Sequence, residues 1–336
     1  FRRVLFRSHA GCEAAWAAAS RGARVRLITQ NLDTIAKMSC NPAIGGIGKG
    51  HLVHEVDALG GLMGIAADRS ALQYRLLNRS KGPAVQATRA QCDRRIYHMV
   101  MREMLDSHPR VHLHQGTVSE LLFDGDRVSG AVDELDVKHL AGAVVLTTGT
   151  FLAGLIHVGE KTFAAGRSGD APVHGLTDEL YRRSFNLGRL KTGTPPRLDK
   201  ASIAWESLQS QPGELDAQPF SSLHEQVTQQ QIPCAITRTT ERSHEIIREN
   251  ISRAPMYSGA IEGTGPRYCP SIEDKVVRFA DKGSHQIFLE PEGADHNEVY
   301  PNGISTSLPV DVQWAFIRSI PGLEQAIIIR PGYAIA

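Results

Sequence analysis

The stretch Ser39-Cys40-Asn41-Pro42-Ala43-Ile44-Gly45-Gly46-Ile47-Gly48-Lys49-Gly50-His51 contains four glycines, one cysteine and one lysine. Glycine lacks a side chain and loses more conformational freedom on folding than other residues. A cluster this dense therefore indicates that the backbone approaches another group closely. That group would be a phosphate, a flavin or a planar base. A flexible loop is the alternative, although an ordinary turn needs only one or two glycines.

The spacing of these glycines excludes a phosphate-binding P-loop. That motif requires a glycine five positions before the glycine of its Gly-Lys pair, and a serine or threonine directly after the pair. Around Gly48-Lys49, these positions are occupied by Ala43 and Gly50.

Length and composition are those of an ordinary globular protein. A chain of 336 residues can bury a large core and predicts two domains. Apolar runs such as 143–146 and 326–329 are far too short to cross a bilayer, so we expect no contact with a membrane. Residues 1–8 lack the apolar stretch of a signal peptide. The net charge of +1 neither favours nor excludes nucleic-acid binding.

The cysteines predict a reducing, cytoplasmic environment. They are five in number, scattered, and never arranged as Cys-x-x-Cys. This pattern argues against a disulfide framework and against structural zinc. The fourteen histidines show no spacing typical of metal ligands, so no metal site is predicted.

The first third of the chain reads as an α/β unit. Residues 9–21 are alanine-rich with helical spacing, and 24–29 alternate as in a strand. Further on, the pattern predicts a helix over 94–105, a strand over 111–114 and a hairpin over 119–137. Residues 143–146 predict a buried strand that runs into the turn at Gly149. Strands that end in glycine turns at one sheet edge are typical of cofactor sites.

The dinucleotide fingerprint is incomplete. Gly-x-Gly-x-x-Gly would place glycines at positions 6, 8 and 11, and only Gly11 is present; Phe6 and Ser8 occupy the other two. Beyond residue 151 prolines and glycines become frequent. Segment 200–232 is polar and predicts an exposed excursion, and 286–290 predicts a strand.

Several long motifs resemble the family of the tRNA uridine 5-carboxymethylaminomethyl modification enzyme MnmG, also called glucose-inhibited division protein A. The resemblance is collinear from His9 to Ile335 and includes the basic-rich run Arg189-Leu190-Lys191-Thr192-Gly193-Thr194-Pro195-Pro196-Arg197. The other segments that carry it are 39–61, 80–85, 88–91, 265–275 and 300–309. Where the family has Gly-Gly-Gly-His-Ala-Gly, this chain has Phe6-Arg7-Ser8-His9-Ala10-Gly11, so we expect weak binding of FAD.

The resemblance implies an α/β fold in which an FAD-binding, Rossmann-like (glutathione-reductase-like) domain carries an inserted second α+β domain. The expected division is 1–150 for the FAD-binding domain, incomplete because residues 1–8 are atypical. Residues 151–336 would form the inserted NAD-binding and substrate domain, and return toward the first domain near 310–336. The family's C-terminal helical domain is not expected within this chain.

The resemblance also implies a function. Family members install an aminomethyl-type or carboxymethylaminomethyl group on C5 of the tRNA wobble uridine U34, together with the GTPase partner MnmE. FAD and NADH serve as cofactors, methylene-tetrahydrofolate gives the one-carbon unit, and glycine or ammonium gives the amine. The expected assembly is a homodimer that forms a heterotetramer with MnmE.

The predicted cofactor residues fall into three groups. By resemblance, FAD would contact His9, Ala10, Gly11, Val118 and Val173. From the glycine patterns, the flavin would contact Gly45, Gly46, Gly48 and Gly149. By resemblance again, NAD would lie against segment 265–279, including Gly265, Arg267, Glu273 and Lys275.

Cys40 and Cys269 are the predicted catalytic residues. Uracil C5 is a poor nucleophile until a thiolate adds to C6, so the reaction needs a reactive cysteine in a basic, glycine-rich setting. Cys40 lies near Lys49, and Cys269 lies near Arg267. The family's proposed catalytic cysteines fall on these positions. Cys12, Cys92 and Cys234 lack such surroundings and are expected to be buried apolar residues.

Basic residues predict contacts with phosphates or with the folate tail, although a solvated basic face explains them equally well. The candidates are Lys49, Arg79, Lys81, Arg89, Arg189, Lys191 and Arg197. Two other classes of function stay open at this point: a flavin oxidoreductase that acts on a small molecule, and a non-catalytic fragment.

Overall fold

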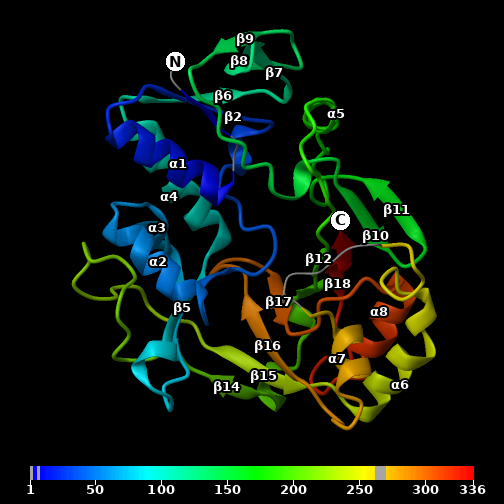
Figure 1. Ribbon diagram of the computed structural model, residues 1–336. Helices are drawn as coiled ribbons and strands as arrows, with labels where there is room; N and C mark the ends of the chain where they lie inside the picture. The colour runs from blue at the N-terminus through cyan, green and yellow to red at the C-terminus, as the bar shows by residue number, and fades with distance from the viewer. Residues whose placement is uncertain (1–2, 6–7, 262–269) are drawn as a thin grey trace.

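The computed structural model describes residues 3–5, 8–261 and 270–336 of the chain. It combines a small parallel sheet near the N-terminus with antiparallel sheets in the rest of the molecule, the largest of which has six strands (Figure 1). The described part of the chain has no helix that is both long enough and apolar enough to cross a membrane.

The parallel sheet has the order β1-β2-β6 and is the nucleus of the N-terminal part. Its strands are β1 (Arg3–Leu5), β2 (Val25–Thr29) and β6 (Val111–Gln115). Helix α1 (His9–Ser20) leads from β1 to β2 and contacts β2, and α4 (Arg94–Ser107) leads into β6. The predicted helices and strands of this unit are therefore confirmed.

Capping side chains fix where these helices begin. The Ser8 hydroxyl accepts the backbone N–H of Gly11, and the Asp93 carboxylate accepts the N–H groups of Arg95 and Ile96. Such caps satisfy backbone donors that have no partner within the helix. Alanines on one side of α1 are fully buried, which lets the helix approach the sheet closely.

Between β2 and α4 the chain builds a separate antiparallel layer. Its sheet has the order β3-β5-β4, with strands β3 (Ala43–Gly45), β4 (Ala71–Leu77) and β5 (Ala87–Cys92). Helices α2 (Lys49–Ala58) and α3 (Met63–Ser70) connect β3 to β4. The glycine-rich stretch thus forms β3 and the beginning of α2.

The predicted hairpin is present as β7 (Val118–Asp124) and β8 (Arg127–Asp133), followed by β9 (Lys138–Leu140). Gly125 makes the turn with a φ of +57°, which glycine adopts without steric cost.

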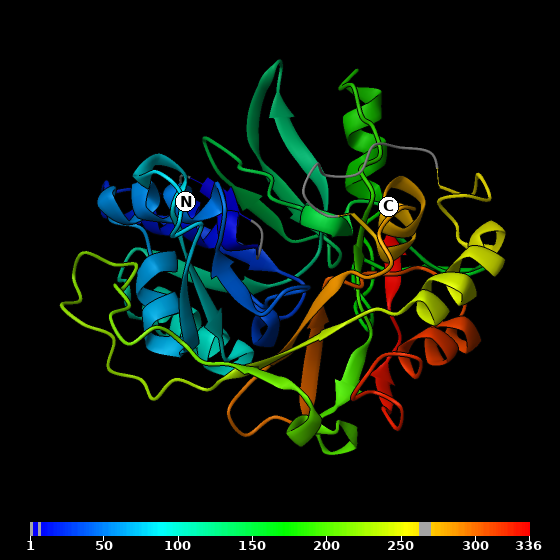
Figure 2. The same cartoon turned by 90° about the horizontal axis from the view of Figure 1, so that it is seen from below.

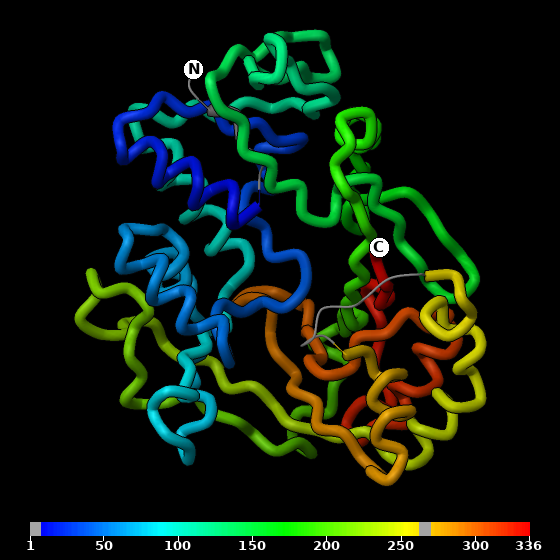
Figure 3. Tube along the Cα trace, viewed as in Figure 1, coloured from blue at the N-terminus to red at the C-terminus, as the bar shows by residue number. Residues whose placement is uncertain are grey.

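Two further antiparallel sheets make up the second half. One has the order β11-β10-β19-β12, with β10 (Leu155–Val158), β11 (Lys161–Ala164), β12 (Thr192–Thr194) and β19 (Tyr333–Ile335). The last strand of the chain therefore pairs with strands from its middle (Figure 3). Helix α5 (Gly175–Arg182) lies between β11 and β12 in the sequence.

The six-stranded sheet has the order β14-β15-β16-β17-β13-β18. The bounds are β13 (Arg197–Asp199), β14 (Gln209–Gln211), β15 (Cys234–Arg238), β16 (Gln286–Pro291), β17 (Glu298–Asn302) and β18 (Ile328–Arg330). Helices α6 (Glu241–Glu249), α7 (Ile272–Arg278) and α8 (Val310–Ile317) gather beside this sheet (Figure 2). Together they bury a second apolar core, separate from the one around α1 and α4.

The strand predicted at 143–146 does not form. Residues 143–148 are half-buried, and among them only Val144 makes a bridge.

The exposed excursion predicted at 200–232 is wrong in one respect. Phe220 is only 1% exposed and belongs to the N-terminal core. The buried carboxylate of Asp68 accepts the backbone N–H groups of Phe220 and Ser221, at 2.7 and 2.8 Å. A polar segment is thus held to the protein by contacts that include one aromatic side chain and one buried carboxylate.

Replacing Phe220 tests this anchor. We expect Phe220→Ala to lower the free energy of unfolding by about 3–5 kcal/mol, because it leaves a cavity beside Tyr74 and His54. Leu215→Ala is the matched control: Leu215 is fully exposed in the same segment and should change stability by less than about 0.5 kcal/mol. Urea denaturation followed by circular dichroism measures both. Equal midpoints for the two variants would contradict the anchoring role.

Candidate functional site

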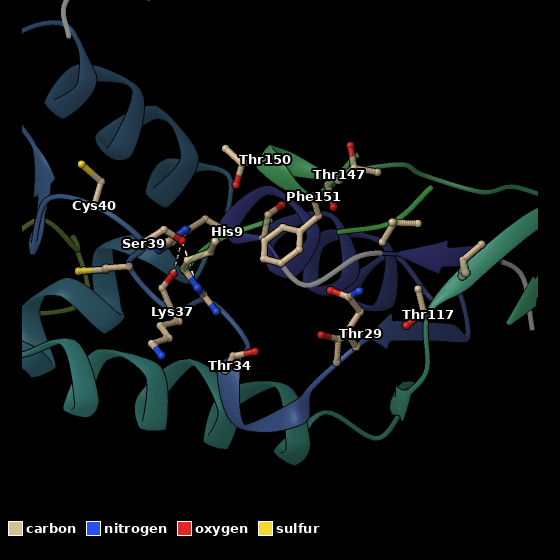
Figure 4. A pocket seen from close by; sticks show the side chains of 18 of the residues that line it. His9, Thr29, Thr34, Lys37, Ser39, Cys40, Thr117, Thr147, Thr150 and Phe151 are labelled. Carbon is tan, nitrogen blue, oxygen red and sulfur yellow. Dashed lines mark hydrogen bonds between the residues drawn. The ribbon is translucent and has the colours of Figure 1, made fainter. Parts of the chain in front are cut away.

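A cavity of about 370 Å³ lies where the parallel strands end (Figure 4). Its wall includes Thr29 at the end of β2, Gly116 just after β6, and Ser8 and His9 at the N-terminal end of α1. The carboxyl ends of parallel strands beside a helix N-terminus are where open α/β sheets bind dinucleotides. We call this space the crevice.

The crevice is elongated. Thr117 lies at one end and Cys40 at the other (Figure 4). A second cavity, of about 400 Å³, adjoins it and shares His9, Asn41, Ala43 and Ile44 in its wall. This adjoining cavity is lined by Lys49 of α2 and by Arg89 of β5.

His9 lines both spaces and has an unpaired polar atom. Burial lowers the pKa of His9 to about 4, so its imidazole is neutral at physiological pH. Its Nε2 atom is buried and has no hydrogen-bond partner among the described residues. A buried polar atom without a partner costs about 1–3 kcal/mol, which a bound ligand would recover.

Cys40 is half-buried in the crevice wall, and its thiol contacts a tyrosine from the other half of the chain. Its Sγ lies 3.1 Å from the hydroxyl oxygen of Tyr300 on β17 and 3.5 Å from the carbonyl oxygen of Gly193. Tyr300 is buried, and burial followed by the charge of Cys40 raises the pKa of its hydroxyl well above the usual range. The hydroxyl therefore keeps its proton and can donate it to a thiolate.

A buried ionic cluster fixes the loop that carries Cys40. The Glu292 carboxylate accepts Arg197 Nε at 2.6 Å and also pairs with Arg94. Arg197 Nη2 donates to the carbonyl of Cys40 at 3.1 Å, and Arg94 donates to the carbonyl of Met38. Burial alone would raise the pKa of Glu292, but the guanidiniums of Arg197 and Arg94 lower it below its usual value.

The structure gives the predicted flavin-binding glycines mainly another role. A Cβ atom at Gly45 would lie 2.4 Å from the carbonyl oxygen of Thr88 and 2.5 Å from the Phe220 ring, so close packing of the chain requires glycine there. Gly46 and Gly48 have φ values of +97° and +74° and make the turn into α2. Gly45 lines the adjoining cavity, whereas Gly46 and Gly48 line neither space.

Only some of the other predicted cofactor residues line the crevice. Val118, Gly149 and Val173 line the crevice, as does His9. Gly11 is buried inside α1, and Ala10 is exposed outside the crevice wall. Gly265, Arg267 and Cys269 lie outside the described residues.

The remaining two predicted NAD contacts make hydrogen bonds within the protein. Glu273 is buried and accepts the Thr306 hydroxyl at 2.8 Å and the Ser307 N–H at 3.0 Å. Lys275 Nζ donates to the carbonyl of Gly303 at 2.7 Å.

The three remaining described cysteines are buried, as the sequence predicts. Burial raises the pKa values of Cys12, Cys92 and Cys234 to about 12, so they are thiols at neutral pH. Among the described cysteines, only Cys40 lines the crevice.

Two of the residues predicted to contact phosphates or the folate tail have guanidiniums that pair with buried carboxylates. Arg89 donates to Glu290 at 2.6 Å, and Arg197 donates to Glu292. Arg79 is exposed but pairs with Glu214 and Asp216. Among the other predicted basic residues, Arg189 donates to the backbone carbonyls of Ala153 and Ala336, Lys81 is exposed and Lys191 is half-buried.

The fold brings together a group that the sequence spacing did not indicate. One ligand atom from each of His114, Asp133 and His139 lies within 4.8 Å of the others. Arg26 contacts Nδ1 of His139 at 2.9 Å, and a guanidinium can only donate. The proton of His139 must then reside on Nε2, 2.9 Å from Asp133, which leaves that nitrogen unable to bind a metal.

This group is therefore a hydrogen-bonded junction between β2, β6 and the hairpin. Burial would raise the pKa of Asp133, but hydrogen bonds from His139 and from backbone N–H groups lower it to about 2.

Sequence reasoning missed Lys37, Arg167, Tyr300 and Glu292. Tyr300 was recoverable, since it begins one of the unusual motifs. No local sequence pattern indicates a role for Glu292, because its partners Arg197 and Arg94 lie about 100 and 200 residues away in the sequence.

The sequence and the fold both have known relatives. The family model described as "Glucose inhibited division protein A" matches residues 8–336. The chain is 54% identical over 332 residues to the tRNA uridine 5-carboxymethylaminomethyl modification enzyme MnmG of Syntrophotalea carbinolica. That alignment covers 99% of the chain and 54% of the relative.

Two structures of GidA from Aquifex aeolicus resemble this structure, with TM-scores of 0.93 (form II crystal) and 0.94 (form I crystal). Their sequence identities are 47% and 49%, and the matches cover 100% and 99% of the chain but 55% and 57% of the GidA chains. The predicted α/β, FAD-binding Rossmann-like fold class is confirmed. The chain spans about half the length of these relatives.

Alkylation tests the placement of the cysteines. In a Cys269→Ser background, native protein at pH 7.5 should be labelled by iodoacetamide only at Cys40, because the other three thiols are buried and protonated. All four should label in urea. Peptide mass spectrometry reads the result. Labelling of Cys12, Cys92 or Cys234 at the rate of Cys40 in native protein would contradict the burial described above.

Proposed function

The chain belongs to the glucose-inhibited division protein A family, and on that premise we propose that it takes part in C5 modification of the tRNA wobble uridine U34. The product would be an aminomethyl or carboxymethylaminomethyl uridine, made together with the GTPase MnmE. The observation that carries the proposal is a half-buried cysteine, Cys40, at one end of a dinucleotide-type crevice and in contact with a protonated tyrosine.

FAD is the cofactor that we propose for the crevice. Two features support the fit: the crevice begins at the carboxyl ends of β2 and β6, and His9 offers an unpaired nitrogen in its wall. Thr117 and Val118 would hold the adenosine end, and Ser8 and His9 would face the pyrophosphate. When bound, FAD would supply the redox chemistry, with NADH as its reductant.

Cys40 would act as the nucleophile. Its thiolate would form a bond to C6 of uracil, and C5 would then bond to the methylene carbon of methylene-tetrahydrofolate as one carbon–nitrogen bond of that carbon breaks toward nitrogen. Loss of the C5 proton would release tetrahydrofolate and leave an exocyclic methylene on C5. Addition of glycine or ammonium to this carbon, with loss of a proton from the amine and expulsion of the Cys40 thiolate, would restore the C5–C6 double bond. Tyr300 would hold the sulfur toward the crevice through its hydroxyl. Cys269 would assist from the segment that precedes α7.

The proposed division near residue 150 separates an FAD-binding part from a part that supplies NAD and substrate contacts. It is supported by the two separate apolar cores. The core around α1 and α4 also includes Phe220, so the two parts share side chains across the boundary. A homodimer that binds two MnmE subunits is the proposed assembly.

Flavin binding tests the crevice. Phe6 and Ser8 replace two glycines that would let the pyrophosphate approach the backbone, so the unaltered chain should bind FAD weakly. Phe6→Gly with Ser8→Gly should tighten FAD binding at least tenfold by equilibrium dialysis. In that background, Thr117→Trp should abolish binding by filling the adenosine end, and Thr162→Trp, on the exposed strand β11, should not. Equal affinities of the two tryptophan variants for FAD would contradict the proposal that FAD binds in the crevice.

Cysteine replacement tests the chemistry. The assay contains tRNA, MnmE, GTP, methylene-tetrahydrofolate, glycine or ammonium, FAD and NADH, and nucleosides are measured by mass spectrometry. Cys40→Ser should abolish the modified uridine without changing FAD affinity, since serine is a far weaker nucleophile. Cys234→Ser is the control, because its hydroxyl can keep the contact with Gln91 Oε1.

Tyr300→Phe removes only the hydroxyl and should slow modification about tenfold or more while FAD affinity stays unchanged. Near-normal product from Cys40→Ser would reject the covalent mechanism. No product from the unaltered chain would reject the proposed activity for this chain.

A further inference from the structure

A third cavity, of about 460 Å³, lies on the other side of the Cys40 loop. It shares Lys37, Ser39 and Arg167 with the crevice, so the two spaces are neighbours across these side chains. We call it the cationic cavity. Nothing in the flavin chemistry proposed above uses it.

The lining of the cationic cavity carries an excess of positive charge. Six lining side chains are cationic, and three are carboxylates. The cations are Lys37, Arg94, Arg95, Arg167, Arg197 and Arg330, and the carboxylates are Asp33, Glu292 and Glu298.

These carboxylates do not neutralise the cations. Glu292 serves both Arg94 and Arg197, and Glu298 pairs with Arg330. Among the described residues, Lys37 and Arg95 form no ion pair closer than 4.0 Å.

Arg167 shows that the cavity lacks an acceptor. This residue is only 7% exposed, with Nε on Asp170 at 2.6 Å and Nη1 on the Ser39 hydroxyl at 3.0 Å. Its Nη2 is buried without a partner in the described structure, as are Arg94 Nε and His296 Nε2. Three unsatisfied nitrogens around one basic cavity are the arrangement that a bound anion would complete.

We propose that the cationic cavity binds a small polyanion, a molecule with two or more carboxylate or phosphate groups, whose uncharged part extends past Ser39 toward Cys40. The functional part of this proposal deepens and rests on the proposed function: the ligand would be a co-substrate whose anionic end is held here while its reacting end enters the crevice. Binding itself does not depend on that function.

A small molecule fits better than a nucleic-acid backbone. Arg167 and Arg197 are 7% and 5% exposed, whereas phosphates of a folded RNA are contacted by side chains on an accessible surface. Lys37 supports the binding of an anion of either kind. Burial, then the charges of Arg167 and Arg94, lowers the pKa of Lys37, and an anion between them would relieve that repulsion.

Calorimetry with two probes tests the proposal. Citrate and pyrophosphate are titrated into the full chain at constant ionic strength, with acetate as the monoanion control. We expect one of the two polyanions to bind with 1:1 stoichiometry, at least tenfold more tightly than acetate. Tighter binding of citrate would indicate recognition of carboxylates, and tighter binding of pyrophosphate would indicate recognition of phosphates.

Two variants locate the binding. Lys37→Gln combined with Arg95→Gln removes exposed side chains that make no ion pair, so the fold should survive, and affinity should fall tenfold or more. Lys161→Gln, on exposed β11, is the matched control and should bind like the unaltered chain. Thr117→Trp, which fills the crevice, should leave polyanion binding unchanged, so failure of flavin binding and failure of this proposal are distinguishable.

The proposal is overturned if neither polyanion binds more tightly than acetate, or if the Lys37→Gln/Arg95→Gln variant retains full affinity. It is also overturned if a tRNA anticodon stem-loop binds, the double variant loses that binding, and neither small polyanion binds. That outcome would assign the cavity to nucleic acid.

Discussion

The carboxylate of Glu292 is the interaction on which the site depends. It accepts two guanidiniums, from Arg94 at the start of α4 and from Arg197 on β13, and these arginines in turn hold the carbonyls of Met38 and Cys40. Removing one member of a buried ion pair costs about 3–5 kcal/mol, because the other charges stay buried without compensation. The cluster therefore joins the two halves of the chain and fixes the Cys40 loop at once.

The cluster explains how an irregular loop can hold a reactive group accurately. Residues 35–42 form neither helix nor strand, so their backbone position depends on contacts from elsewhere. The six-stranded sheet supplies those contacts: β13 carries Arg197, β17 carries Tyr300, and the Arg197 guanidinium lies 4.7 Å from the centre of the Tyr300 ring. A cysteine contributed by the first half of the chain is thus oriented by the second half.

The sequence predicted local structure well and long-range contacts poorly. The helix at α1, the strand at β2 and the hairpin of β7 and β8 follow from spacing and turn residues, which act over a few positions. Residues 143–146 have the composition of a strand, yet among them only Val144 makes a bridge, which no local pattern reveals. The sequence showed that the glycine run is unusual. It did not show that Thr88 and Phe220, which are distant in the sequence, leave no room for a side chain at Gly45. Cys40 was predicted because it lies beside the local glycine motif. Glu292 was not predicted, because its role depends on Arg94 and Arg197, which are distant in the sequence.

The loop from Lys37 to Cys40 separates two spaces of opposite character. On one side, the crevice is lined largely by threonines and apolar residues; on the other, the cationic cavity is lined by arginines. The hydrogen bond from Arg167 to the Ser39 hydroxyl lies at their boundary, and Arg167 is held there by Asp170. A molecule with an anionic end and a reactive uncharged end would be oriented by this contrast, because more cationic side chains line the cationic cavity than line the crevice. The buried cluster that fixes Cys40 therefore also fixes the direction from which such a molecule would reach it.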